Sequence, residues 1–128
     1  MNEQQISKEV IDTAAGWAAS FNRGDASGCA DFYTENAKMQ AEPMAQVQGR
    51  EAIREFWKTL IDGGYADVQY LDPKVKVLSE SKAELRSPWS MNLASGLIHR
   101  ELWERQEDGN WRLADDHFEV IEQASSNA

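Results

Sequence analysis

The chain has 128 residues, of which 41% are hydrophobic and 27% are charged, and its formal net charge at pH 7 is −9. This length and composition suit a single globular domain over residues 1–128, with one core. The negative charge and the lack of a Lys/Arg cluster argue against nucleic acid and anionic membranes as partners, because both require a basic surface. The single cysteine, Cys29, excludes an internal disulfide and a cysteine-rich zinc site.

No apolar run approaches the roughly 18 residues that a membrane helix needs. The start of the chain, MNEQQISKEV, lacks the basic residues and the apolar stretch of a secretory signal. We therefore expect a cytoplasmic protein that has no membrane segment.

Three helices are predicted in the N-terminal half. Residues 4–22 carry apolar side chains at three- and four-residue steps, so these side chains share one face of a helix. Gly24 can end that helix in the left-handed conformation, and Asp25 can cap a short second helix. Residues 37–49 alternate weakly and fit a short strand or a bent edge segment. A third helix is predicted over about 50–62.

The apolar period then changes from about 3.6 to 2, which is typical of strands. Residues 68–77 form one strand or two pieces of a bent strand, and residues 83–93 alternate through the next. Residues 97–105 and 110–121 form a hairpin. Residues 122–128 are expected to be a disordered tail.

This order of elements predicts an α+β domain in which three N-terminal helices pack on one face of a curved, mostly antiparallel sheet. A sheet that curls around the long first helix leaves a cavity at its open end. The cavity is the expected site for a small-molecule ligand.

The register of the last hairpin decides which polar side chains face that cavity. An Asp-Gly pair suits either a two-residue turn or a three-residue loop over residues 107–109. The three-residue loop places Trp103 opposite Leu113, whereas the two-residue turn places the charged Glu104 there. We favour the three-residue loop, with Gly109 in the left-handed conformation.

In this register, Glu101 lies opposite Asp115 and His99 lies opposite His117. All four would share the concave face with the tryptophans of the hairpin, at the mouth of the cavity. A contiguous apolar patch on the outer face would favour a homodimer formed through the sheet. The predicted outer patch consists of Ile98, Leu102 and Phe118.

Three stretches carry a resemblance to a known family: WAASFNRGDASGCADFYTENA (17–37), QGREAIREFW (48–57) and ELWERQEDGNWRLADDHFEV (101–120). On these stretches, the chain resembles the nuclear transport factor 2-like superfamily, in its SnoaL-like and ketosteroid-isomerase-like branch. The resemblance implies a cystatin-like, cone-shaped roll with an internal pocket, commonly as a homodimer. The branch includes isomerases, cyclases and dehydratases as well as non-catalytic binding and association domains, so the fold does not settle the function.

Ketosteroid isomerases of this branch use an aspartate base on the first strand. A tyrosine on the first helix and a protonated aspartate on a late strand stabilise the oxyanion. Here the tyrosine position falls on Trp17, the base position on Ala41 or Glu42, and the second acid on or near His99. All three positions depart from the pattern, so steroid isomerisation is not expected.

His117 and Asp115 are the predicted catalytic pair, because alternate residues of a strand share a face. A carboxylate beside an imidazole orients its tautomer, and such a pair suits proton transfer next to a carbonyl or elimination of water. The competing interpretation is the solvated polar rim of a strand. His99 and Glu101 would contact the substrate. These four groups could also hold a metal ion, but a hydrogen-bonded network is the preferred interpretation, and neither a metal nor a cofactor is predicted.

Five tryptophans in a small domain mostly fill space, yet beside a cavity they favour an apolar or planar ligand. Trp17, Trp89 and Trp103 are predicted to contact the substrate, together with Met39, whose unbranched side chain adapts to a ligand.

The sequence thus predicts a SnoaL-like protein with an internal pocket for a small molecule. One hypothesis is cofactor-independent isomerase, cyclase or dehydratase chemistry on a small apolar or aromatic substrate, with His117 as general acid or base. The alternative is a non-catalytic ligand-binding or dimerisation domain.

Overall fold

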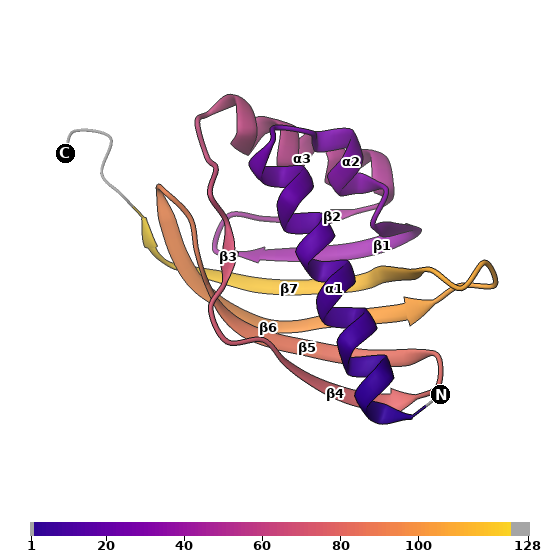
Figure 1. Cartoon of the computed structure of the whole chain (residues 1–128). Helices are drawn as coiled ribbons and strands as arrows, with labels where there is room; N and C mark the ends of the chain where they lie inside the picture. Colours follow the sequence, from indigo (N-terminus) through magenta and orange to yellow (C-terminus); the bar gives the residue numbers. More distant parts are fainter. Residues whose placement is uncertain (1, 124–128) are drawn as a thin grey trace.

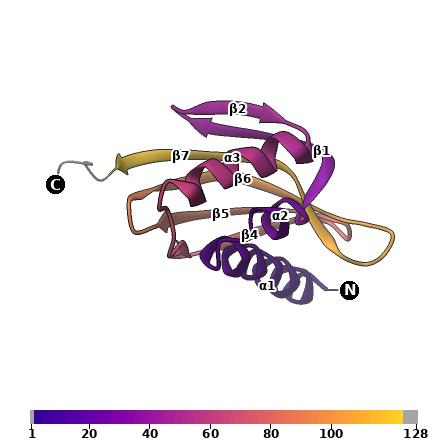
Figure 2. The same ribbon diagram turned by 90° about the horizontal axis from the view of Figure 1, so that it is seen from above.

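A long N-terminal helix lies diagonally across the concave face of a curved sheet (Figure 1). This computed structural model describes residues 2–123. The core lies between the sheet and the helices (Figure 2). The helices are α1 (Glu3–Asn22), α2 (Ala26–Ala30) and α3 (Arg50–Asp62).

Seven strands form the sheet in the described residues, in the order β2-β1-β7-β6-β5-β3, with β4 also paired to β5. Neighbouring strands are antiparallel, except that β1 and β7 run parallel. The strands are β1 (Tyr33–Glu42), β2 (Ala45–Gln48), β3 (Gln69–Tyr70), β4 (Lys74–Ser79), β5 (Lys82–Ser90), β6 (Ala94–Arg105) and β7 (Trp111–Gln123).

The predicted α+β architecture is confirmed, with two differences in detail. The first two helices are consecutive, but α3 follows the β1–β2 hairpin, which replaces the single bent segment expected over 37–49. The prediction of a mostly antiparallel sheet holds only in part, because the sheet is mixed: the first strand, β1, runs parallel to the last, β7. The predicted tail begins too early: Glu122 and Gln123 belong to β7, while residues 124–128 lie outside the described residues.

Local sequence signals account for the first two helices. Asn2 caps α1 by accepting a hydrogen bond from the backbone N–H of Gln5, whose side chain accepts one from Asn2 in return. Gly24 takes the left-handed conformation after α1, with φ of 77°. Asp25 then caps α2 by accepting from the N–H of Gly28 at 2.8 Å. The apolar stripe of α1 is buried as predicted and comprises Ile6, Val10, Ala14, Trp17, Ala18 and Phe21.

The loop of the last hairpin has the predicted three-residue form. The N–H of Gln106 donates to the carbonyl oxygen of Asn110 at 2.8 Å, and Gly109 has a φ of 86°. Trp103 lies opposite Leu113, and both side chains are buried. The hydrophobic pattern therefore selected the correct loop.

Two β-bulges farther along the hairpin reverse the expected faces. Ala114 is an extra residue on β7, because Trp103 pairs with Leu113 but Leu102 pairs with Asp115. His99 is an extra residue on β6, because Ile98 pairs with Phe118 but Arg100 pairs with His117. The register between β6 and β5 also shifts at this place. Each bulge moves the side chains beyond it, counted from the hairpin loop, to the opposite face of the sheet.

The predicted pairs of Glu101 with Asp115 and of His99 with His117 are therefore wrong. Glu101 does face the helices, but its partner is Asp116, and both are buried. Asp115, His117 and His99 lie on the outer face.

The bulges also correct the predicted outer apolar patch. Ile98 and Phe118 point into the core, where they are 8% and 6% exposed. The patch that favoured a dimer thus loses Ile98 and Phe118, and the homodimer remains a prediction. No helix among residues 2–123 combines the length and the apolar character needed to cross a membrane.

Gly96 allows β6 and β7 to approach closely beyond the second bulge. A Cβ at this position would collide with the backbone carbonyl oxygen of Glu119 and lie 3.0 Å from the ring of Trp89.

We expect the substitution G96A to lower the free energy of unfolding, measured by urea denaturation, by about 1–3 kcal/mol, because overpacking costs about that much. The neighbouring control S95A should change it by less than about 0.5 kcal/mol. Equal stability of the two variants would contradict this close approach.

Candidate functional site

A small internal cavity lies between α1, α3 and the concave face of the sheet. Its volume is about 30 Å³, which is room for a water molecule but not for a substrate. A wider hollow of about 710 Å³ lies outside, beside β4 and β5, and it contains neither buried carboxyl group. The internal cavity is lined by Trp17, Trp57, Val68, Tyr70, Trp89, Met91, Ile98, Glu101, Asp116 and Phe118.

Two carboxyl groups face this otherwise apolar cavity. Glu101 on β6 and Asp116 on β7 are register partners, and their side chains are 4% and 3% exposed. Acidic residues are almost never buried without partners. Their burial here therefore depends on the hydrogen bonds that they accept.

Three aromatic side chains supply these hydrogen bonds, and Trp57 supports one of the three. Tyr33 Oη donates to Asp116 Oδ2 at 2.7 Å and accepts from Trp57 Nε1 at 3.2 Å. Glu101 accepts at both oxygens, from Tyr70 Oη at 2.8 Å and from Trp103 Nε1 at 3.0 Å. Asp116 thus receives a donor at one of its oxygens, whereas Glu101 receives one at each.

Burial raises the pKa values of the two carboxyl groups and of the tyrosines that donate to them. Removal from water raises the pKa of Glu101, and the charge of Asp116 raises it further. Burial also raises the pKa of Asp116, and Asp115 adds repulsion, although the hydrogen bond from Tyr33 opposes the rise. Since two neighbouring acids share one dry site, the pair titrates as a unit and retains a proton well above the usual carboxyl range. The pKa values of Tyr33 and Tyr70 also lie well above that of a free tyrosine, mainly through burial.

Two indole N–H groups in the cavity wall have no partner. Trp17 Nε1 and Trp89 Nε1 are both buried without a hydrogen bond, whereas Trp57, Trp103 and Trp111 each donate one. A buried donor without a partner is costly in a native structure. A ligand oxygen in the cavity could accept from these groups.

A second, smaller cavity of about 10 Å³ lies toward the molecular surface. It shares Trp89, Met91 and Phe118 with the first cavity and extends to Met44, which is 42% exposed. Met91 is only partly buried, and its unbranched thioether adapts readily. This wall is the most direct route by which the cavity could enlarge.

Several of the predicted substrate contacts do lie at this site. Trp17, Trp89 and Glu101 line the cavity, and Trp103 holds Glu101. Met39 is buried on β1 but is not part of the cavity lining.

The predicted catalytic pair lies elsewhere. Asp115 is bound by Arg100 at 3.3 Å on the outer face, and Arg100 also pairs with Glu84 at 2.5 Å. His117 and His99 lie on that same face, next to each other. These three side chains do not contribute to the cavity.

The sequence indicated Tyr33 and Tyr70 as possible donors into the pocket but did not orient them, and Asp116 was not among the predicted site residues. Regular alternation from Leu113 placed Asp116 outside. One signal could have corrected it: Phe118 lies an odd number of positions after Leu113, so burying both on one face requires an extra residue between them.

Comparison with solved structures shows the same fold. A ketosteroid isomerase-like protein from Erwinia carotovora atroseptica SCRI1043 has a TM-score of 0.77 at 19% identity, over 94% of this chain and 98% of that one. A cystatin-like protein of unknown function from Nostoc punctiforme PCC 73102 has a TM-score of 0.76 at 16% identity, over 88% of each chain. A nuclear transport factor 2-like protein with a cystatin-like fold from Novosphingobium aromaticivorans has a TM-score of 0.73 at 18% identity, over 94% of this chain and 84% of that one.

Identities this low show the fold alone. No curated protein matches the chain. The SnoaL-like domain model, however, matches residues 14–91, which is more than half of the sequence. The chain therefore belongs to the SnoaL-like domain family.

Proposed function

We propose that this protein is a cofactor-independent acid/base enzyme that isomerises, cyclises or dehydrates a small apolar or aromatic carbonyl compound. One observation carries the proposal: two buried carboxyl groups, Glu101 and Asp116, share an apolar cavity with two unpartnered indole donors. Pairs of acids whose environment shifts their pKa values are typical of proton-transfer sites. The ketosteroid isomerase-like neighbour supports the same class of reaction by analogy of fold.

Asp116 is the group that we assign to proton transfer. Tyr33 occupies one of its oxygens, which leaves the other for a substrate. The ionised carboxylate would take a proton from a carbon next to the substrate carbonyl. The electrons of the broken C–H bond form a C=C bond, and the carbonyl π electrons move onto oxygen, giving an enolate. Asp116 then returns the proton to another carbon in an isomerisation, or to a departing hydroxyl group in a dehydration.

Trp17 and Trp89 would bind the enolate oxygen. Their N–H groups are buried and unpartnered, and donors fixed in a dry site stabilise developing negative charge strongly. Glu101 supports Asp116 from the neighbouring strand: two donors hold it in place, and its proximity keeps one proton in the pair. A substrate must displace side chains to enter, and Met91 and Trp89 are the first candidates because they separate the two small cavities.

A non-catalytic binding domain is the second candidate function. The observation that favours it is the small volume of the cavity, about 30 Å³. In that case a ligand would bind without any proton exchange. Proton exchange on a bound ligand therefore separates the two functions.

We expect D116N to slow proton exchange by at least about 100-fold, because a general base contributes roughly that much. Small carbonyl compounds are first screened by thermal shift. Those that bind are then incubated with enzyme in D₂O, and loss of the proton signal next to the carbonyl is followed by NMR. The matched control D115N removes the adjacent carboxylate on the outer face and should exchange within a few-fold of wild type. Equal exchange by D116N and wild type would refute the role of Asp116, and binding without exchange would favour the second function.

Substitution of the tryptophans tests the assigned indole donors. W17F, W89F and W103F all remove ring volume, but only W103F removes an N–H that has a protein partner. We expect W103F to lose about 1–3 kcal/mol more stability than W17F, because Glu101 is left without one donor. By isothermal titration calorimetry, W17F and W89F should weaken binding of a carbonyl ligand. Unchanged ligand affinity in both would argue against an oxygen-binding role.

The raised pKa values predict how stability depends on pH. Between the usual carboxyl pKa of about 4 and the raised values, the folded chain binds more protons than the unfolded chain. The contribution of this pair is therefore full at low pH and is lost as the pH rises through the folded-state pKa values. E101Q removes one of the two acids and should flatten this decline in urea denaturation between about pH 5 and 8. D115N should show the same decline in stability as wild type. Parallel profiles of stability against pH for E101Q and wild type would contradict the raised pKa values.

A further inference from the structure

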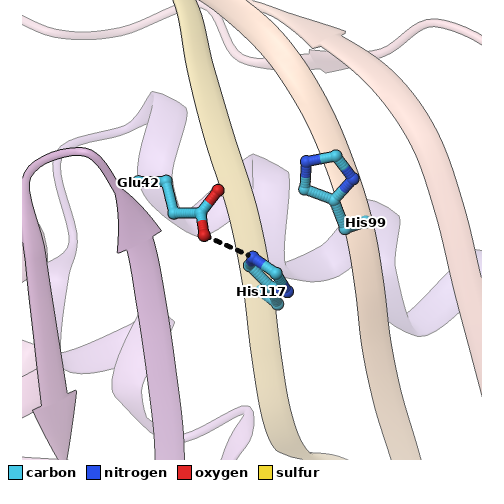
Figure 3. Close-up of side chains that lie close together, drawn as sticks. All are labelled: Glu42, His99 and His117. Carbon is cyan, nitrogen blue, oxygen red and sulfur yellow. Dashed lines mark ion pairs between the residues drawn. The ribbon is translucent and has the colours of Figure 1, made fainter.

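The outer face of the sheet brings together both histidines of the chain. The sequence contains two, His99 on β6 and His117 on β7. Their ring centroids lie 5.0 Å apart, with an angle of 50° between the ring planes. Glu42, at the end of β1, completes the group from the third strand (Figure 3).

The bulge at His99 creates this arrangement. In a regular strand, the side chain of His99 would point inward, as those of Trp103 and Glu101 do. With the bulge, His99 lies outside, where His117 also lies because of the bulge at Ala114. Both imidazoles therefore reach the same place through two separate irregularities in the sheet.

We propose that Glu42, His99 and His117 bind a divalent transition-metal ion, Zn²⁺ above all. Each residue offers one ligand atom, and these three atoms all lie within 4.8 Å of one another. Two imidazole nitrogens and one carboxylate oxygen are a ligand set that zinc sites use, with a water molecule as the fourth ligand. The buried Cys29 lies in α2 and cannot contribute.

The geometry is close to what a zinc ion requires. Bonds of about 2.0–2.2 Å in a tetrahedron place neighbouring ligand atoms roughly 3.3 Å apart. Glu42 Oε1 already lies 3.2 Å from His117 Nε2, although their orientation does not make a hydrogen bond. All three ligand atoms lie within 4.8 Å of one another, so His99 must approach by up to about 1.5 Å to reach the same tetrahedral spacing. Its side chain is 38% exposed, so it has space to do so.

Two further side chains are placed to orient the ligands. Glu119 Oε1 lies 2.8 Å from Nε2 of His99, and Gln40 Nε2 donates to Glu42 Oε1 at 2.7 Å. Carboxylates that hydrogen-bond a metal-binding histidine fix its ring orientation and increase metal affinity. These contacts would hold the free site near its bound form.

The site is independent of the proposed catalytic function. His117 and Asp116 are consecutive but point to opposite faces of β7, so the sheet itself separates the metal from the internal cavity. A bound ion would instead clamp β1, β7 and β6 together from outside. Metal binding and proton exchange can therefore be tested separately.

Isothermal titration calorimetry of untagged, chelator-treated protein with ZnCl₂ and with CoCl₂ tests the proposal. We expect one ion per chain, a visible Co²⁺ absorption band of a low-coordinate site, and a rise in melting temperature with metal concentration. H99A, H117A and E42Q should each weaken binding by more than about 100-fold, because loss of a ligand exceeds the 10–100-fold effect of losing an orienting partner. E119Q should weaken it by about 10–100-fold.

D115N is the matched control, since Asp115 lies on the same face of β7 but pairs with Arg100. It should bind Zn²⁺ as wild type does, and circular dichroism should show that every variant is folded. The proposal is overturned if wild type binds no Zn²⁺ at submillimolar concentration, if H117A binds it as tightly as wild type, or if one ion binds per two chains.

Discussion

Two extra residues in the last hairpin, Ala114 in β7 and His99 in β6, determine the chemistry of both faces of the sheet. A bulge exchanges the faces of all the side chains beyond it. The first bulge turns Asp116 inward to meet Glu101, and the second turns His99 outward to meet His117. The buried carboxyl pair and the exposed histidine pair are thus products of the same backbone irregularities. A regular hairpin with this sequence would instead turn Glu101, Asp115 and both histidines to the concave face.

Burying two acids in an apolar cavity costs free energy, which this fold offsets only in part. Three aromatic donors bind the pair directly, and each hydrogen bond to a charged group contributes about 1.5–3 kcal/mol. Replacing such a network by packed hydrophobic residues often leaves a protein equally stable or more stable. Stability alone therefore gives little reason for Glu101 and Asp116 to be inside. A use in proton transfer gives one, and the two indole donors that face the same cavity without partners agree with it.

Much of the fold could be predicted because its signals are local. The apolar stripe of α1, the cap at Asp25 and the period of α3 each specify an element through neighbouring residues. The three-residue loop followed from the requirement that Trp103 should not face a charge. The site could not be predicted in the same way, because a bulge changes the register without changing composition. LADDHF alternates equally well in either register, and only the burial of Phe118 separates the two.

The parallel pairing of β1 with β7 has a consequence for how the chain reaches this structure. The last strand, β7, lies between β1 from the N-terminal half and β6 from the C-terminal half. On its other side, β1 pairs with β2. During synthesis, β1 and β2 must wait for nearly the whole domain to emerge from the ribosome before their central partner exists. Contacts between residues so distant in sequence slow folding, because a long loop must close before they form. The domain is therefore expected to assemble cooperatively after β7 is complete, rather than growing strand by strand from its N-terminus.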